Sequence, residues 1–274
     1  MESRHDRRPT STGAVLAWTF AKRELKSRYK GTLLGWLWSL IVPLAMLGLY
    51  AIVFGLIFRA QVQPMGNGHP PVYALWLYIG LTAYNFFANA VVGGANALWA
   101  ASGLINKIRV SVLAPVLGNA IAAGMQALVE VALFLAVLAV FGNVGWTWLL
   151  LLTWSLLFLG FAGGLAVVMS VFAAYFRDAL LLYAVLLQLL LFATPVMYPL
   201  TMIPERIFGA VPLRDIIGQA PLARFLEMAR TVTYDLTPGR LSDWFVLVLW
   251  SALALAIGTW TARRFGQDVA EKLQ

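Results

Sequence analysis

The chain has 274 residues, of which 61% are hydrophobic and 12% are charged, and its formal net charge is +8. Soluble domains are typically about 45–50% apolar and about 25% charged, so this composition excludes a disordered chain and argues against a soluble globular enzyme. A membrane-spanning helix needs about 20 apolar residues, so the chain has room for roughly six or seven spans but not for a separate large soluble domain.

The N-terminal region is polar and then becomes amphipathic. We expect residues 1–12 to form a cytoplasmic tail and residues 13–30 to form an amphipathic helix. The predicted apolar stripe of this helix recurs every three or four residues and comprises Ala14, Trp18, Ala21, Leu25 and Tyr29. Its basic side carries Lys22, Arg23, Lys26 and Lys30. A basic amphipathic helix with a tryptophan on its apolar face typically lies in the membrane interface, and an ordinary surface helix is the alternative.

Six apolar segments follow in chain order, and each is predicted to span the membrane: residues 34–58, 72–98, 113–141, 146–175, 179–198 and 243–261. The longest polar stretch, residues 199–242, separates the fifth span from the sixth and is interrupted by prolines. Its apolar pieces are too short to span, so we expect short re-entrant or interfacial helices there. The predicted fold class is an all-α membrane protein with six transmembrane helices.

The distribution of basic residues predicts the orientation. With six spans and a cytoplasmic N-terminus, 14 of the 20 lysine and arginine residues fall in cytoplasmic segments. An excess of lysine and arginine marks the cytoplasmic loops of membrane proteins. We therefore expect both termini to be cytoplasmic in a multi-pass membrane protein.

Several kinds of chemistry are missing from the sequence. It contains no GxxxxGK[ST] motif and no Gly-Lys dipeptide, so any ATP and Mg²⁺ must be bound by a partner subunit. Cysteine is absent and the only two histidines, His5 and His69, are far apart, which argues against a metal site. No protease or hydrolase signature stands out. We expect a protein that is not an enzyme and binds no cofactor itself.

Three residues within the predicted spans could have a functional role. Glu130 lies deep in the third span, where a carboxylate is costly and often functional. It is a candidate for the translocation path, or it forms a local hydrogen bond with Gln126 one turn away. Tyr50 and Tyr84 could stack on sugar rings and donate hydrogen bonds to them, but ordinary helix packing predicts the same residues.

The predicted cytoplasmic connections carry candidate contacts to a partner. Residues 98–111 read as a short helix with an apolar edge, and the candidates on it are Trp99, Asn106, Lys107 and Arg109. A plain interfacial turn is the alternative. In the next cytoplasmic turn, Arg177 either contacts the same partner or forms a local ion pair with Asp178, which would contribute little.

Two glycine pairs have the GxxxG spacing that lets membrane helices approach closely: Gly31 with Gly35, and Gly160 with Gly164. Such pairs are frequent by chance in apolar helices, so the signal is weak.

A longer pattern resembles a known family. The run SRYKGTLLGWLWSLIVPLAMLGLYAIVFGLIFR at residues 27–59 is similar to the opening of bacterial ABC-2 type polysaccharide exporter permeases, which export O-antigen, capsule, teichoic acid and related glycans. LINKIRVSVLAP at 104–115, YFRD at 175–178 and TPVMYP at 194–199 follow in the family's order. The resemblance covers residues 13–272. One departure is Gln219-Ala220-Pro221, where family members often carry Asn-Pro.

The resemblance implies a single ABC-2 transmembrane domain over residues 31–274 in the bacterial inner membrane. This domain would form one half of a homodimeric pore docked on two copies of a cytoplasmic ABC ATPase. Residues 13–30 would be the interface helix, with Lys22 and Lys26 facing the ATPase, and residues 98–111 would be the coupling helix. Residues 199–242 would gate the outer exit. Trp38, Pro43, Pro195 and Tyr198 lie where the family's channel and gate residues fall.

The implied substrate is a polyprenyl-diphosphate-linked glycan. Arg28, Tyr29 and Lys30 form a candidate entry rim, because clustered cations at a membrane surface bind anionic head groups. Alternatively, these cations set the membrane topology and attract anionic membrane lipids. We expect no nucleic-acid partner.

Three other functions compete with this hypothesis. The same scaffold could export a small lipid or drug. An ion-coupled carrier would need several intramembrane carboxylates and often has internal repeats, whereas Glu130 stands alone. A glycan-modifying enzyme would need a carboxylate cluster, whereas the outer acidic residues are scattered and form no motif.

Overall fold

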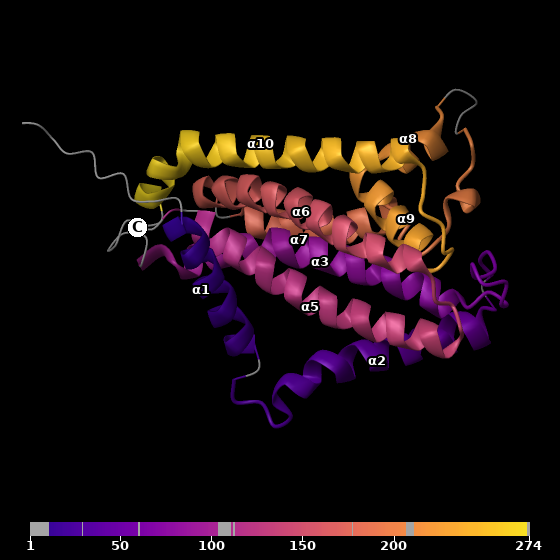
Figure 1. Ribbon diagram of the computed structural model, residues 1–274. Helices are drawn as coiled ribbons and strands as arrows, with labels where there is room; N and C mark the ends of the chain where they lie inside the picture. The colour runs from indigo at the N-terminus through magenta and orange to yellow at the C-terminus, as the bar shows by residue number, and fades with distance from the viewer. Residues whose placement is uncertain are drawn as a thin grey trace, which may run out of the picture.

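The computed structural model describes residues 11–28, 30–59, 61–103, 111, 113–176, 178–206 and 211–272. Figure 1 shows long helices lying side by side, with the short helices α8 and α9 at one end and α1 at the other. The helices are α1 (Ser11–Arg28), α2 (Trp38–Tyr50), α3 (Tyr73–Ala100), α5 (Leu113–Val140), α6 (Leu150–Tyr175), α7 (Ala179–Ala193), α8 (Leu213–Gln219), α9 (Pro221–Thr233) and α10 (Leu241–Lys272).

Five of the apolar helical segments are long enough to cross a membrane, and α7 is a shorter sixth one. The five are Gly35–Ile57, Tyr73–Ala100, Leu113–Val140, Trp146–Tyr175 and Leu241–Gly266. Within the described residues no β-strand occurs. The all-α membrane fold is therefore confirmed, and the count of six spans stays a prediction.

Helix α3 is the centre of the bundle. It packs against α5, α6, α9, α7 and α2, and 78% of its most apolar window is buried. This position explains its polar composition, because polar side chains within membrane spans are tolerated where they face other helices rather than lipid.

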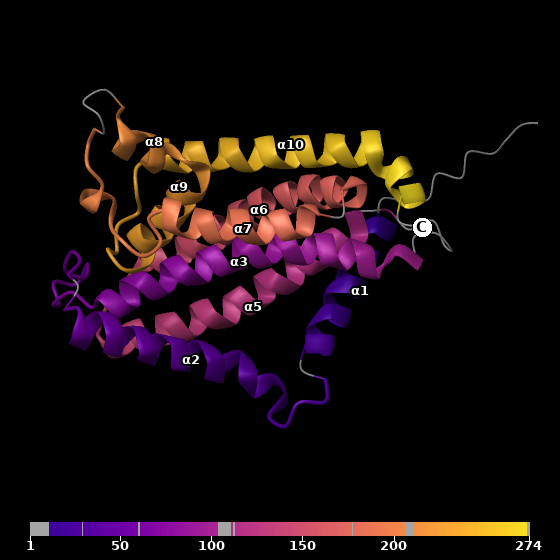
Figure 2. The ribbon, with the colours of Figure 1, turned by 180° about the vertical axis from the view of Figure 1, so that it is seen from behind.

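The first span is the opposite case. Only 6% of its window is buried, and Figures 1 and 2 show α2 diverging from α5 toward the end that carries α1. Ser39, Pro43 and Leu47 form its narrow buried stripe. The span begins with a 3₁₀ turn (Gly35–Leu37) and ends in a π-helix (Ala51–Ile57). Long π-helical stretches are rare and often mark functional segments.

The fifth apolar helix ends earlier than predicted. The predicted span at 179–198 is an α-helix only over Ala179–Ala193. Thr194 leaves the helix with φ −93° and ψ 145°, because the residue before a proline, here Pro195, is biased away from the helical region. A 3₁₀ turn (Leu200–Met202) follows, then α8 and α9, so the short helices expected between the fifth and sixth spans are confirmed.

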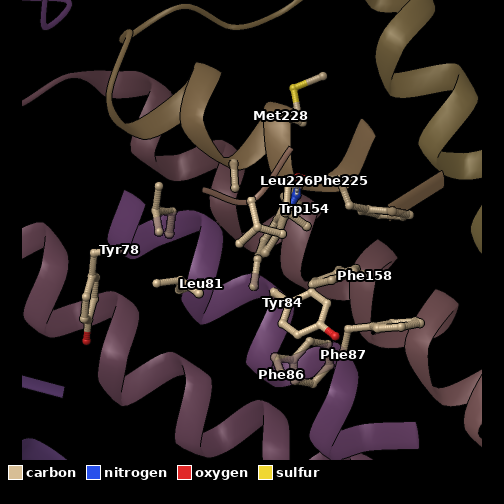
Figure 3. Packing of buried hydrophobic residues seen from close by; sticks show 14 of the residues in the cluster. Tyr78, Leu81, Tyr84, Phe86, Phe87, Trp154, Phe158, Phe225, Leu226 and Met228 are labelled. Carbon is tan, nitrogen blue, oxygen red and sulfur yellow. Dashed lines mark hydrogen bonds between the residues drawn. The ribbon is translucent and has the colours of Figure 1, made fainter. Parts of the chain in front are cut away.

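Helix α9 is anchored at one end of the bundle by aromatic packing. The Trp154 indole nitrogen donates to the Phe225 carbonyl oxygen at 2.9 Å, and the rings of Phe158 and Phe225 stack with centroids 4.8 Å apart. Figure 3 shows these three side chains together between α6 and α9. Tryptophan suits this position because it buries a large ring and still finds an acceptor for its N–H.

The last helix is longer than the predicted span at 243–261. Helix α10 continues to Lys272, because no proline interrupts residues 262–272 and most of them are adequate helix formers. Its C-terminal end lies at the same end of the bundle as α1, opposite α8 and α9 (Figure 2).

Helix α1 covers most of the predicted range, but the face that packs on the bundle matches the predicted apolar stripe only in part. Ala17 and Ala21 are 5% and 0% exposed, and α1 packs on α5. Trp18 from the predicted stripe is 44% exposed, because the small residues allow the closest approach of two helices. The amphipathic, interfacial character of α1 stays a prediction.

Candidate functional site

The end of the bundle that carries α1 holds the candidate partner contacts. A groove of about 250 Å³ lies between α1 and the neighbouring ends of α3 and α5, and Arg23, Ser27, Ala97 and Pro115 are among the residues that line it. The structure therefore places the predicted interface helix beside the start of the predicted coupling segment, residues 98–111.

The individual residues at this end are placed as follows. Lys22 and Lys26 are exposed on α1, and the Lys22 ammonium lies 5.3 Å from the centroid of the Trp18 ring. Trp99 lies in the last turn of α3 and is half-buried, and Lys30 is exposed. Arg28 is the last residue of α1. The remaining candidates lie outside the described residues: Tyr29, Asn106, Lys107, Arg109 and Arg177.

The three candidates on the first span face different surroundings. Trp38 is 40% exposed, Pro43 belongs to the buried stripe, and Tyr50 is half-buried with its ring 6.4 Å from that of Phe54. Phe54 in turn lies 5.2 Å from Tyr73 at the start of α3. Tyr50 thus belongs to a row of rings that leads from the first span to α3.

Glu130 and Tyr84 both make contacts inside the chain. Glu130 is half-buried on α5, and its carboxylate oxygen accepts from the Gln126 amide at 3.4 Å. Tyr84 is 5% exposed, and its hydroxyl donates to the Leu187 carbonyl oxygen of α7. These contacts agree with the alternatives of local hydrogen bonding and helix packing. A role for either residue in a translocation path stays a prediction.

At the opposite end of the bundle, Pro195 and Tyr198 lie in the irregular segment after α7. The Tyr198 hydroxyl donates to the Phe192 carbonyl oxygen at 2.7 Å, which satisfies one carbonyl at the end of α7. Pro195 is buried, and its carbonyl oxygen accepts from the Arg230 guanidinium at 2.8 Å.

Arg230 is a residue that the sequence did not single out. It lies on α9 with 0% of its side chain exposed, and its guanidinium carbon lies 3.5 Å from the centroid of the Trp76 ring on α3. The sequence carries no clear signal for this burial, because residues 225–232 also include Glu227 and Thr231 and read as an ordinary amphipathic segment.

A second cluster at this end ties the loop at residues 61–72 to the end of α9. The Tyr234 hydroxyl accepts from the Val72 N–H at 2.9 Å, and the Gln63 amide donates to the Asp235 carboxylate at 2.8 Å. Burial raises the pKa of Asp235 from 3.8 to about 6. The Gln63 hydrogen bond lowers this pKa, the charge of Glu227 raises it and that of Arg230 lowers it.

Asp235 gives a prediction about pH dependence. Its pKa is higher in the folded than in the unfolded chain, so its protonated form favours folding, and that stabilisation is lost as the pH rises through about 6. The melting temperature of the purified protein should therefore fall between pH 5 and pH 7.5, and Asp235→Asn should reduce that fall. Asp215→Asn, at an exposed position on α8, is the control. If the melting temperature of Asp235→Asn falls with pH as much as that of the wild type, Asp235 is not the group responsible.

Comparison with known proteins agrees with this architecture. The ABC-2 type transporter family matches residues 15–214. The O-antigen export system permease protein RfbA of Klebsiella pneumoniae is 26% identical over 219 residues, which cover 78% of this chain and 80% of the relative. RfbA of Myxococcus xanthus is 26% identical over 252 residues, 89% of this chain and 88% of the relative.

A capsule transporter is also similar. The polysialic acid transport protein KpsM of Escherichia coli is 23% identical over 239 residues, which cover 85% of this chain and 89% of the relative. Since the family match spans well over half of the chain and the described helices form an all-α membrane bundle, the chain belongs to the ABC-2 type transporter family and is a multi-pass membrane protein.

Proposed function

We propose that this chain is the transmembrane subunit of an ATP-driven transporter that exports a polysaccharide across the bacterial inner membrane. The observation that carries the proposal is the similarity, over 78% to 89% of the chain, to permeases named for O-antigen export and polysialic acid transport. The resemblance of residues 27–59 to polysaccharide exporter permeases supports the same substrate class.

The energy source is a separate cytoplasmic ABC ATPase, present in two copies, which binds ATP and Mg²⁺. The absence of a phosphate-binding loop from the sequence supports this division of labour. The groove between α1 and the end of α3 supports a docking surface at that end of the bundle. The predicted contacts on it are Lys22, Lys26, Trp99, Asn106, Lys107, Arg109 and Arg177.

The chain functions as a homodimer in this proposal. Large apolar side chains face outward on two helices, for example Leu44 and Leu49 on α2, and Leu181 and Leu189 on α7. A lipid face and a second copy of the chain both suit such surfaces. Two copies would enclose a path that one copy leaves open on the side of α2, since only 6% of the most apolar window of this span is buried.

Both termini are cytoplasmic in this proposal. The placement of α1 and the C-terminal end of α10 at the same end of the bundle supports a common side (Figure 2). The excess of lysine and arginine in the segments assigned to that side supports the cytoplasm.

The substrate is anchored to the membrane by a polyprenyl diphosphate, which Arg28, Tyr29 and Lys30 recognise at the cytoplasmic rim. A cation near a membrane surface contributes about 1 kcal/mol to binding an anionic head group. Replacing both Arg28 and Lys30 by glutamine should therefore weaken head-group binding by about thirtyfold. Export at limiting substrate should fall, whereas membrane insertion should not change.

Export and insertion are measured separately for this double variant, by surface polysaccharide staining and by the amount of protein in the membrane. Arg263→Gln with Arg264→Gln, an exposed pair near the end of α10, is the control for a general loss of positive charge. Unchanged export in the Arg28 and Lys30 variant would contradict the proposal that these residues bind the diphosphate head group.

The whole proposal is tested by deleting the gene for this chain and restoring it. Loss of surface polysaccharide with accumulation of lipid-linked glycan at the cytoplasmic face of the membrane is expected, and the tagged chain should be purified with an ATPase that carries a phosphate-binding loop. Normal surface polysaccharide in the deletion strain would reject the proposal in favour of an exporter of a small lipid or drug.

A further inference from the structure

Helix α7 ends before it is long enough to cross a membrane. A 15-residue helix is about 22 Å long, which is shorter than the hydrocarbon core of about 30 Å. Helix α7 packs beside α3 and α6 and ends at Ala193, so the chain beyond it is irregular backbone next to other helices. Such backbone is stable in a membrane only where protein groups satisfy its polar atoms.

Three successive carbonyl oxygens after the break are satisfied by side chains from two other helices. The Arg230 guanidinium on α9 donates through Nη1 to the Pro195 oxygen at 2.8 Å and through Nη2 to the Val196 oxygen at 2.7 Å. The Tyr73 hydroxyl on α3 donates to the Met197 oxygen. The broken end of α7 is therefore held from α3 and α9 together.

The guanidinium is held on its other faces as well. It stacks on Trp76 at 3.5 Å from the ring centroid, and its Nε–H points to the Trp76 carbonyl oxygen at 3.4 Å. Its carboxylate partner is Glu227, at 3.5 Å and 43% exposed. Arginine suits this site because a rigid planar fork can serve two acceptors and stack on an aromatic ring at the same time, which lysine cannot.

A glycine on α3 makes the room that the guanidinium needs. A Cβ atom placed on Gly80 would overlap the Nη2 atom of Arg230 and would lie 3.3 Å from the Val196 carbonyl oxygen. Gly80 lies inside α3, where alanine is the better helix former. The glycine is therefore explained by the position of Arg230 and not by the needs of its own helix.

We propose that Arg230, in the space left by Gly80, is a positioning residue that fixes the broken end of α7 against α3 and α9 and so sets the shape of the transport path at this end of the bundle. The part of the inference that concerns transport rests on the proposed function. In this arrangement α3, the end of α7 and α9 act as one body.

Two substitutions on different helices should release the same segment. Arg230→Gln removes the fork, and Gly80→Ala pushes the fork away from the Val196 carbonyl. The matched controls are Arg224→Gln, a half-buried arginine on the same helix paired with Asp243, and Gly163→Ala, where a Cβ would make an ordinary contact of 3.6 Å with Leu117. Arg230→Lys should not restore the wild-type behaviour.

The readout uses the absence of cysteine from the chain. Val196 is 0% exposed, and Arg230 binds its backbone, so Val196→Cys introduces a buried thiol and leaves the contact in place. In nanodiscs, a water-soluble maleimide should label this thiol slowly in the otherwise wild-type chain. Labelling should be about tenfold faster or more with Arg230→Gln or Gly80→Ala, because local opening controls access, and unchanged with either control.

Two further measurements on the same variants test for general unfolding and for an effect on transport. Ala162→Cys, at a 0% exposed position in α6, should stay unreactive in every background, and its labelling would overturn the local assignment. Polysaccharide export should fall with Arg230→Gln and Gly80→Ala but not with the controls.

Each outcome decides a different part of the inference. If the labelling rate of Val196→Cys does not change when Arg230→Gln is added, Arg230 does not hold the end of α7. If Arg230→Gln speeds the labelling of Val196→Cys but polysaccharide export stays at the wild-type level, Arg230 holds the end of α7 without a role in transport. If deletion of the chain leaves surface polysaccharide normal, the proposed function has failed, and the labelling alone then decides whether Arg230 holds the end of α7.

Discussion

Replacing Gly164 by alanine is expected to force α6 away from α10 and to leave much less folded protein in the membrane. A Cβ atom at Gly164 would overlap the backbone carbonyl of Ala254, and one at Gly258 would lie 2.6 Å from the Gly164 oxygen. The neighbours are backbone atoms and cannot rotate away, so the two helices must separate along their contact. Overpacking of this kind costs about 1–3 kcal/mol, and we expect the upper part of that range.

The measurement compares Gly164→Ala with Gly163→Ala, its neighbour in the same helix. At Gly163 a Cβ would lie 3.6 Å from Leu117, which is an ordinary contact, so this control should fold normally. Monodisperse yield after detergent extraction and the melting temperature report the difference. Equal stability of the two variants would show that the backbones of α6 and α10 do not touch at this point.

The same glycine spacing has two different physical origins in this chain. Gly160 and Gly164 lie inside α6, where small residues allow α10 to approach closely. Gly31 and Gly35 have the same spacing, but both have positive φ, +80° and +53°, with no neighbour within 4 Å of a Cβ. They serve the turn before the first span. The spacing alone could not separate these cases, because the difference lies in which helix packs opposite.

Apolar segment length predicted most of the helices, and local backbone chemistry explains the differences. The second span was expected at 72–98 and is Tyr73–Ala100, because a run of apolar residues between turn formers fixes its ends. The fifth helix ends at Ala193 instead of 198 because Pro195 imposes an extended residue before it. The π-helix at Ala51–Ile57 had no sequence signal, because the residues AIVFGLI suit an α-helix equally well.

The candidate site was predictable in outline but not in its contacts. The short helices after the fifth span followed from prolines and short apolar runs, and Pro195 and Tyr198 followed from family resemblance. Arg230 was counted only as one more basic residue of an outer segment. Its burial depends on three partners far away in the sequence, namely Trp76, Pro195 and Val196, and no local pattern specifies such long-range pairing.

Replacing Gly118 by alanine is expected to detach α1 from α5 while the rest of the bundle stays folded. A Cβ atom at Gly118 would lie 2.8 Å from the Ala17 carbonyl oxygen and 3.2 Å from the Ala21 nitrogen, so the backbone of α1 must move. At about 1–3 kcal/mol for overpacking, the equilibrium between docked and detached α1 should shift by about fivefold to 150-fold. The bundle should survive because α3, α5 and α6 pack against one another without α1.

Detachment of α1 can be measured without reference to transport. Ala21→Cys places a thiol at a 0% exposed position, which should label about tenfold faster with Gly118→Ala. Gly124→Ala, on the same helix, is the matched control, because its Cβ would lie 3.6 Å from Phe86 and 3.7 Å from Leu159. If α1 is the docking helix of the proposed ATPase, Gly118→Ala should also release that ATPase on purification. Faster labelling with the ATPase still bound would place the docking surface elsewhere, whereas unchanged labelling would mean that Gly118 does not set the distance between α1 and α5.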